Sequence, residues 1–341
     1  MNLDRRLIEF VRPLFGLFIS SVGQGFASGV LVILQALLLS RVITAVFLEG
    51  YDFTGVQKWL LMLLGLTFVR GMAGYLGEVS SGALAVRIKT RLRQRLMDHL
   101  FELGPGPLRY ENSGEIISTV TQGVDQLDAY FSQYLPQVIL AALLPLTIMA
   151  VVFPIDLISG IILLLTAPLI PIFMILIGKG TEAVTNRQYH ALSRLGVHFL
   201  DTLQGLRELK LLGQSRAQSD RLQASAEKYR MATMTVLRIA FLSALALELV
   251  GTISTALIAV QIGLRLLYGH LQFEQAFFIL IIAPEFYLPL RLLGQRFHAG
   301  MSGVSAANRI FAFLEIPAHE PDRAMSREKA ESVDLNSTFT I

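Results

Sequence analysis

The chain has 341 residues, of which 53% are hydrophobic and 16% are charged, with a formal net charge of +3. Soluble globular domains carry about 25% charged residues, so this composition excludes an ordinary soluble domain and indicates a protein that crosses a membrane several times. The absence of cysteine from the sequence excludes disulfides, thiolate catalysis and cysteine-ligated metals. The small net charge gives no reason to expect a nucleic-acid partner.

The N-terminal residues 1–12 are basic and precede a long apolar run. A signal peptide starts in the same way, but this run is too long and no small-residue cleavage site follows it, so an uncleaved anchor is expected. A short amphipathic helix is expected before Arg12 and Pro13, lying along the membrane surface, because proline breaks the pattern there.

Six apolar segments then follow in chain order. They are expected at residues 14–48, 58–103, 115–153, 157–206, 220–268 and 273–314. Each exceeds the roughly 20 residues that cross a hydrocarbon core. The predicted fold is therefore an all-α polytopic membrane protein, with six long transmembrane helices that carry cytoplasmic extensions and form one domain over residues 1–315.

The second segment shows such an extension most clearly. Apolar residues recur at every fourth position, with mostly charged residues between them, at Leu84, Ile88, Leu92, Leu96 and Leu100. This spacing indicates an amphipathic helix that continues the apolar run without a break. A helix over residues 58–103 is about 69 Å long, whereas the hydrocarbon core is about 30 Å thick, so about half of it is expected in the cytoplasm.

Lys and Arg are concentrated in four blocks of the sequence. Residues 1–12 hold 3 of them, residues 87–109 hold 6, residues 179–238 hold 10 and residues 291–329 hold 6, which together make 25 of the 29. Because positive residues favour the cytoplasmic side, these blocks and both termini are predicted to be cytoplasmic.

The expected connections alternate in character. The outer ones are short and nearly free of Lys and Arg, and they fall at residues 49–57, 154–156 and 269–272. Among the inner ones, Gly104 to Pro107 ends the first arm, and Asn112 with Glu115 indicates a capping pair that starts a new helix. The second inner connection, residues 207–221, overlaps a short helix-compatible piece at 206–212.

This arrangement of helices, arms and a polar C-terminal stretch resembles the membrane domain of an ABC exporter. Within that class, several blocks are similar to the CydD family, half of a heterodimeric thiol exporter needed for cytochrome bd assembly. The blocks are residues 123–131, 134–137, 167–174, 198–201, 237–243 and 280–291. The resemblance covers about residues 5–315.

The resemblance implies export of glutathione- or cysteine-type thiols from the cytoplasm to the periplasm across the bacterial inner membrane, driven by ATP and Mg²⁺ in a nucleotide-binding domain. The sequence contains no G-x-x-x-x-G-K-[ST] phosphate loop and no ABC signature motif, so no catalytic residue or cofactor is expected in this chain. Residues 316–341 are expected to be a linker toward such a domain. The implied partners are a CydC-like subunit or a second copy, the nucleotide-binding domain, the bilayer and the thiol.

Five charged side chains are expected near mid-membrane, where a charge costs about 2.5–3.5 kcal/mol unless it is paired or hydrated. They are Arg70, Glu78, Glu248, Glu285 and Arg291. One interpretation is a polar substrate cavity, because arginines and a carboxylate complement the two carboxylates and the ammonium of glutathione. The other is interhelical ion pairing, for example between Arg70 and Glu285.

Paired prolines occur in three of the segments: Pro136 and Pro145, Pro168 and Pro171, and Pro284 and Pro289. Each removes a backbone donor, which is interpreted as a gating kink, with a tolerated kink as the alternative.

The two inner turns are expected to contact the nucleotide-binding domain through short helices. The predicted contact residues are Leu108, Tyr110, Asn112, Leu209, Leu211 and Gly213. Apolar and aromatic anchors are typical of such interfaces.

No metal site is expected, because the histidines lack a convincing ligand spacing. Haem ligation by one of them stays open beside structural or solvated roles. The rival functions are an exporter of haem, lipid or drug, a secondary carrier or channel, and a non-transporting membrane assembly factor. The long charged arms count against a carrier, which is expected to have short inner loops.

Overall fold

A computed structural model of the chain describes residues 5–103, 120 and 123–316, and within them all regular structure is helical. Six helices are long and apolar enough to cross a membrane: Arg6–Phe47, Phe53–Leu103, Val124–Ile155, Leu157–Ile177, Ser215–Leu267 and Phe273–Leu314. The prediction of an all-α protein with six long apolar helices is thus confirmed.

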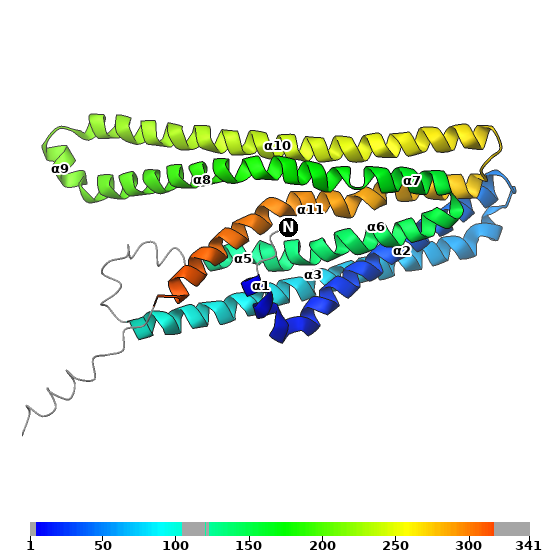
Figure 1. Cartoon of the computed structure of the whole chain (residues 1–341), viewed down its shortest axis with the longest axis horizontal. Coiled ribbons are helices and arrows are strands. Elements are labelled where there is room, and N and C mark those ends of the chain that lie inside the picture. Colours follow the sequence, from blue (N-terminus) through cyan, green and yellow to red (C-terminus); the bar gives the residue numbers. More distant parts are fainter. Residues whose placement is uncertain (1–4, 104–119, 121–122, 317–341) are drawn as a thin grey trace, which may run out of the picture. The chain divides into compact units, whose positions relative to one another are not determined.

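The helices follow one another along the chain as drawn in Figure 1. They are α1 (Arg5–Val11), η1 (Arg12–Leu14), α2 (Phe15–Phe47), α3 (Phe53–Leu103), α5 (Val124–Ala129), the π-helix η4 (Tyr130–Tyr134), α6 (Leu135–Ile155), α7 (Leu157–Thr166), α8 (Leu169–Gln204), α9 (Leu206–Leu211), α10 (Ser215–Leu267) and α11 (Phe273–Leu314).

Several helix boundaries differ from the expected ones. Helix α3 begins five residues before residue 58, because the carbonyl of Asp52 accepts hydrogen bonds from the N–H groups of Gly55 and Val56 at 2.9 and 3.3 Å. Helix α10 begins at Ser215 instead of residue 220, so the expected polar connection is mostly helical. The expected start of the third segment, residue 115, lies outside the described residues.

The turn between α6 and α7 is shorter than expected. Helix α6 continues through Pro154 to Ile155, and Asp156 alone separates the two helices. Asp156 has an extended backbone, and its carboxylate accepts a hydrogen bond from the N–H of Ser159 at 3.0 Å. A side-chain acceptor at this position caps the start of a helix, so a single residue both ends α6 and begins α7. The prediction of a loop over residues 154–156 is wrong.

The expected fourth segment, residues 157–206, is divided into two helices. Helix α7 ends at Thr166, and α8 begins after Ala167 and Pro168. Proline lacks the N–H that would continue the ladder of a preceding helix, so it favours a new helix start.

The helices form two compact units. The first unit contains residues 1–18, 81–133 and 299–341, and the second contains residues 19–80 and 134–298.

The core of the first unit is the predicted stripe of α3. Leu84, Ile88, Leu92 and Leu96 are buried there, and Leu100 is half-buried. Buried residues of α5 and of the end of α11 belong to the same unit: Val124, Leu127, Ala306, Ala307 and Ile310. A four-residue apolar spacing buries one face of a helix, so the sequence located this face correctly.

Helix α1 packs against the end of α11. Its apolar residues Leu7 and Val11 are buried in the protein, and the guanidinium of Arg6 lies 4.7 Å from the centre of the Phe311 ring. The side chain of Arg6 also donates a hydrogen bond to Asn308. The break at Arg12 and Pro13 was predicted correctly, but the apolar face of α1 is directed at protein.

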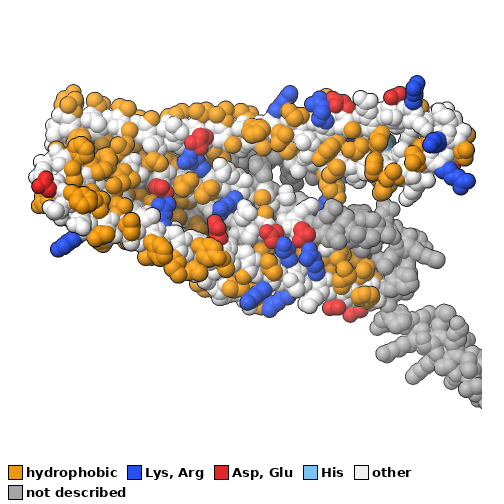
Figure 2. Space-filling view, turned by 180° about the vertical axis from the view of Figure 1, so that it is seen from behind, with side chains coloured by type: hydrophobic (Ala, Val, Ile, Leu, Met, Phe, Trp, Pro, Cys, Tyr) orange, Lys and Arg blue, Asp and Glu red, His pale blue; other side chains and the backbone are white. Residues whose placement is uncertain are grey.

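In the second unit, α8 and α10 run side by side, and α9 joins them (Figure 1). Hydrophobic side chains cover most of the visible surface of the spanning helices, whereas Lys and Arg side chains gather toward the α9 end of the α8–α10 pair (Figure 2). We use "short-turn end" for the opposite end, formed by residues 48–52, 156 and 268–272. Of the basic blocks predicted from the sequence, the one at residues 179–238 belongs to α8, α9 and α10, and it therefore lies toward the end opposite the short turns (Figure 1).

Candidate functional site

Three of the five charged residues expected near mid-membrane lie far along their helices, measured from the short-turn end. Helix α3 begins at Phe53, so Arg70 lies about 26 Å along it and Glu78 about 38 Å, at about 1.5 Å per residue. Arg291 lies about 27 Å from the start of α11 by the same measure. Because a hydrocarbon core is about 30 Å thick, these groups lie near its far boundary. Glu285 lies about 18 Å from the start of α11 by the same measure.

Glu248 and Arg291 form an ion pair that joins α10 to α11. Gly251 of α10 lies beside the Arg291 side chain, and a Cβ atom there would lie 3.4 Å from Cδ of Arg291, an ordinary contact distance. The Nε atom of Arg291 is buried and finds no hydrogen-bond partner among the described residues. Two of the five predicted cavity residues are thus paired with each other.

Arg70 belongs to a different group. Its Nη1 donates to Oε1 of Gln35 on α2 at 3.1 Å, and Nε2 of Gln35 donates to Oγ1 of Thr67 at 2.8 Å. The suggested pair of Arg70 with Glu285 is not formed. Glu285 is half-buried, and no hydrogen bond or ion pair joins it to another described residue.

A second polar group joins α6 to α11. Nη1 of Arg296 donates to Oε1 of Gln137 at 2.7 Å, and Nε2 of Gln137 donates to the backbone oxygen of Pro289 at 2.8 Å. The carboxylate of Glu78 attracts the Arg296 guanidinium from α3. Sequence reasoning missed Gln137 and Arg296, although a lone amide in the apolar helix α6 was a usable signal.

The six predicted kink prolines fall into two classes. Pro136, Pro168 and Pro171 lie at or just before the starts of helices, whereas Pro145, Pro284 and Pro289 lie inside helices. Pro168 and Pro171 leave unmade only bonds that a helix start lacks in any case, whereas Pro136 lies where α6 continues directly from η4. Near the interior prolines of α11, the buried hydroxyl of Tyr287 lies 2.6 Å from Oγ1 of Thr166, at the break between α7 and α8.

The coupling residues expected in the first inner turn, Leu108, Tyr110 and Asn112, lie outside the described residues. In the second, Leu209 and Leu211 lie on α9, and Gly213 follows it with φ of +67°, a value that favours glycine. The side chain of Leu211 is 78% exposed. Helix α9 therefore presents an apolar side chain to its surroundings at the end of the α8–α10 pair.

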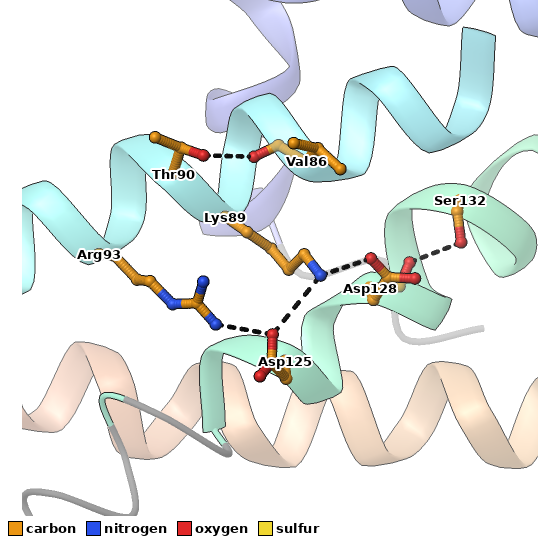
Figure 3. A network of polar contacts seen from close by, with 7 residues as sticks. All are labelled: Val86, Lys89, Thr90, Arg93, Asp125, Asp128 and Ser132. Atoms are coloured by element: carbon orange, nitrogen blue, oxygen red, sulfur yellow. Dashed lines mark hydrogen bonds and ion pairs between the residues drawn. The ribbon is translucent and has the colours of Figure 1, made fainter. Parts of the chain in front are cut away.

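The strongest polar contacts of the first unit join α3 to α5 (Figure 3). Nζ of Lys89 lies 2.7 Å from Oδ1 of Asp128 and 3.5 Å from Oδ1 of Asp125. Nη2 of Arg93 lies 2.7 Å from the same Asp125 oxygen. Both aspartates belong to the 123–131 block, one of those that carry the sequence resemblance, and their ion pairs join α5 to the charged half of α3.

We expect this network to contribute little to stability, because the aspartate side chains are about half exposed. A double-mutant cycle of Lys89→Met and Asp128→Asn, read from chemical unfolding in detergent, should give a coupling free energy of about 0.5–1 kcal/mol. A coupling above about 2 kcal/mol would contradict the view of a solvent-screened network.

Two of the described histidines contact neighbouring helices, although Nε2 of His99 is buried without a hydrogen-bond partner among the described residues. Nδ1 of His198 lies 3.0 Å from Oγ of Ser225, and the ring of His99 packs edge-on against Phe313. A search of the described part of the chain finds no group of three metal-binding side chains.

A buried polar cluster occupies the short-turn end. The carboxylate of Asp156, which is only 3% exposed, is bonded by a guanidinium nitrogen of Arg265 on α10 and by the hydroxyl of Ser159. Oγ of Ser159 lies 3.2 Å from Oε1 of Gln261. Burial raises the pKa of Asp156, but the hydrogen bonds from Arg265 and Ser159 outweigh it and leave the pKa below its ordinary value.

Comparisons with known proteins agree with this architecture. The family described as ABC transporter transmembrane region matches residues 18–286. The Escherichia coli protein called glutathione/L-cysteine transport system ATP-binding/permease protein CydD is 37% identical over 311 residues, which cover 88% of this chain and 52% of that protein. A Bacillus subtilis relative called CydC of such a system is 34% identical over 301 residues, 87% of this chain and 52% of the relative.

A third relative, from Haemophilus influenzae, is also called CydD of a glutathione/L-cysteine transport system. It is 35% identical over 266 residues, 74% of this chain and 45% of the relative. The chain therefore spans about half the length of these relatives.

Proposed function

Because this chain belongs to the ABC transporter transmembrane family, we propose that it is the membrane-spanning part of an ATP-driven exporter, CydD-like, that moves glutathione- or cysteine-type thiols out of the cytoplasm. The single observation that carries this proposal is the identity of 34–37% to the CydD and CydC proteins over most of the chain. It is supported by helices that far exceed the thickness of a bilayer, as α3 and α10 do.

In this role the multi-pass chain resides in the bacterial inner membrane, with both termini and the α8–α10 arm in the cytoplasm. The gathering of Lys and Arg toward the α9 end supports that orientation (Figure 2). ATP and Mg²⁺ bind in a nucleotide-binding domain, since the sequence contains no phosphate loop. The transporter pairs this chain with a CydC-like subunit, or with a second copy.

Helix α9 transmits the motion of that nucleotide-binding domain, with exposed Leu211 as its anchor and Gly213 as its end. The interior prolines Pro145, Pro284 and Pro289 are the positions where α6 and α11 bend during the cycle. The thiol passes among Arg70, Glu78, Glu248, Glu285 and Arg291, together with the side chains that surround them.

The test is thiol uptake into inverted membrane vesicles that contain the full-length protein with its ATP-binding domain. ATP-dependent uptake of labelled glutathione or cysteine is expected. ATP hydrolysis without thiol uptake, but with uptake of haem, a lipid or a drug, would replace the substrate class. Binding to an oxidase without any flux would favour an assembly factor.

Variants of the same protein test the substrate path. Arg70→Ala and Glu285→Gln are each expected to raise the apparent KM for the thiol about 5–10-fold, because each removes a charged partner in a low-dielectric path. Arg230→Gln is the matched control, since Glu227 on the exposed part of α10 is the ion-pair partner of Arg230 among the described residues. An unchanged KM in both test variants would remove these residues from substrate contact.

A further inference from the structure

Arg296 is a partly exposed arginine that makes few hydrogen bonds to the described residues. A guanidinium has five N–H donors, and the only hydrogen bond from Arg296 to a described residue is the one to Oε1 of Gln137. Arg296 lies about 35 Å along α11 from the short-turn end, near the boundary of a 30 Å hydrocarbon layer. Its side chain is half-buried, so part of it is open to the surroundings.

Gln137 fixes the direction of this arginine. Its side chain is 4% exposed, and its two polar atoms are both engaged, the nitrogen with the Pro289 carbonyl and the oxygen with Arg296. Rotating the amide by 180° would set its NH₂ group against the guanidinium donors and its oxygen against the carbonyl. Both bonds would be lost, so only one orientation satisfies the buried amide.

The neighbouring charge is of the opposite sign. Glu78 on α3 lies about 38 Å from the short-turn end, at much the same depth as Arg296. A cation and an anion at one depth form a pattern that complements a zwitterion. An α-amino acid head group, with one carboxylate and one ammonium, has this pattern.

We propose that Arg296, held in orientation by Gln137, binds the carboxylate of the α-amino acid head group of the transported thiol, while Glu78 attracts its ammonium. The inference rests on the proposed function and names the part of the thiol that is recognised. Cysteine and the γ-glutamyl end of glutathione both carry this head group. The guanidinium forms paired hydrogen bonds with a carboxylate, which a lysine ammonium cannot match.

The experiment compares two thiols in inverted vesicles that contain the full-length transporter. Cysteine carries the carboxylate, and cysteamine is the same molecule without it. Arg296→Gln is expected to raise the KM for cysteine at least about 10-fold, as loss of a charge-assisted bond does, and to change the KM for cysteamine less than about 2-fold. The KM for cysteine of Arg296→Lys should lie between those of wild type and Arg296→Gln, because lysine keeps the positive charge but cannot donate the paired hydrogen bonds of a guanidinium.

Gln137→Leu tests the positioning role, since it removes the amide and leaves the arginine. A rise of about 3–10-fold in the KM for cysteine, again with little change for cysteamine, is expected when the guanidinium is no longer directed. Arg230→Gln controls for loss of a cation elsewhere in the chain. ATP hydrolysis without substrate verifies that each variant is folded.

Equal KM changes for cysteine and cysteamine would overturn the proposal and indicate a structural tie between α6 and α11, or a lipid phosphate bound at Arg296. Vesicles of zwitterionic phosphatidylcholine and of anionic phosphatidylglycerol separate these two, since only a site that binds a lipid phosphate responds to the net charge of the head group. If wild-type protein moves neither thiol, the proposed function fails on its own. Stimulation of ATP hydrolysis by dipeptides and by their amidated forms then tests the anion site, and equal stimulation in wild type and Arg296→Gln overturns it.

Discussion

Replacing Gly303 by leucine is expected to lower the free energy of unfolding by about 3 kcal/mol or more. A Cβ atom at Gly303 would lie 2.8 Å from Cβ of Tyr130 and 3.4 Å from the backbone oxygen of Gln126. Neither atom is the tip of a flexible side chain, so the end of α11 must move away from α5 and η4. The small residues Ala306 and Ala307, both buried, lie on the same helix and depend on the same close approach.

The measurement is thermal and chemical unfolding of the purified protein in detergent. Gly82→Leu is the matched control, because a Cβ at Gly82 on α3 would meet no atom within 4 Å. That variant should change stability by less than about 1 kcal/mol, since leucine is a better helix former than glycine. Equal losses in the two variants would show that the packing of α11 on α5 is looser than described.

Asp156→Ala is expected to lower the free energy of unfolding by about 3 kcal/mol. The change leaves Arg265 without its buried anionic partner. Because the side chain of Arg265 is itself 25% exposed, we expect the lost ion pair to cost about 2 kcal/mol of stability, less than a fully buried pair. It also removes the cap of α7, which contributes about 1 kcal/mol. Asp156→Asn keeps a capping oxygen, so it should lose only the ion-pair contribution of about 2 kcal/mol.

Acid unfolding tests the stabilising contribution of Asp156 in a second way. The pKa of Asp156 is lowered in the folded protein, so its stabilising contribution is present above the ordinary carboxyl pKa of about 3.9 and is lost as pH falls through the lower folded value. Stability measured from pH 5 down to pH 3 should therefore fall more steeply for wild type than for Asp156→Asn.

The control for both measurements is Glu274→Gln. Glu274 pairs with Arg41 at the same end of the helices, but both side chains are at least one-third exposed. The loss there should be below about 1 kcal/mol. A loss at Glu274 as large as that at Asp156 would contradict the dependence on burial.

Hydrophobic periodicity was sufficient to predict the helices and much of their packing. The spacing of Leu84, Ile88, Leu92 and Leu96 identified a buried face of α3 because four-residue repeats align on one side of a helix. The end of α3 at Leu103 and both ends of α11 were also placed correctly. Boundaries that depend on one local hydrogen bond, such as the cap at Asp156, could not be derived from periodicity.

The polar site was predicted less completely than the fold. Glu248 and Arg291 were identified as charges in the membrane, but their pairing depends on how α10 and α11 pack against each other. Arg70 donates a hydrogen bond to the neutral side chain of Gln35. An argument based on pairing opposite charges could not predict this partner. Gln137 was passed over because an amide adds nothing to the net charge, although a buried amide in an apolar helix must bind something.

The paired rods α8 and α10 have a mechanical consequence. Helix α10 runs from Ser215 to Leu267, which is about 80 Å, so about 50 Å of it projects beyond a 30 Å hydrocarbon layer. A tilt of about 5° at the membrane boundary then displaces the tip at α9 by about 4 Å. Because two helices packed side by side resist bending better than one, a push at the tip reaches the membrane as rotation and is not absorbed as flexure.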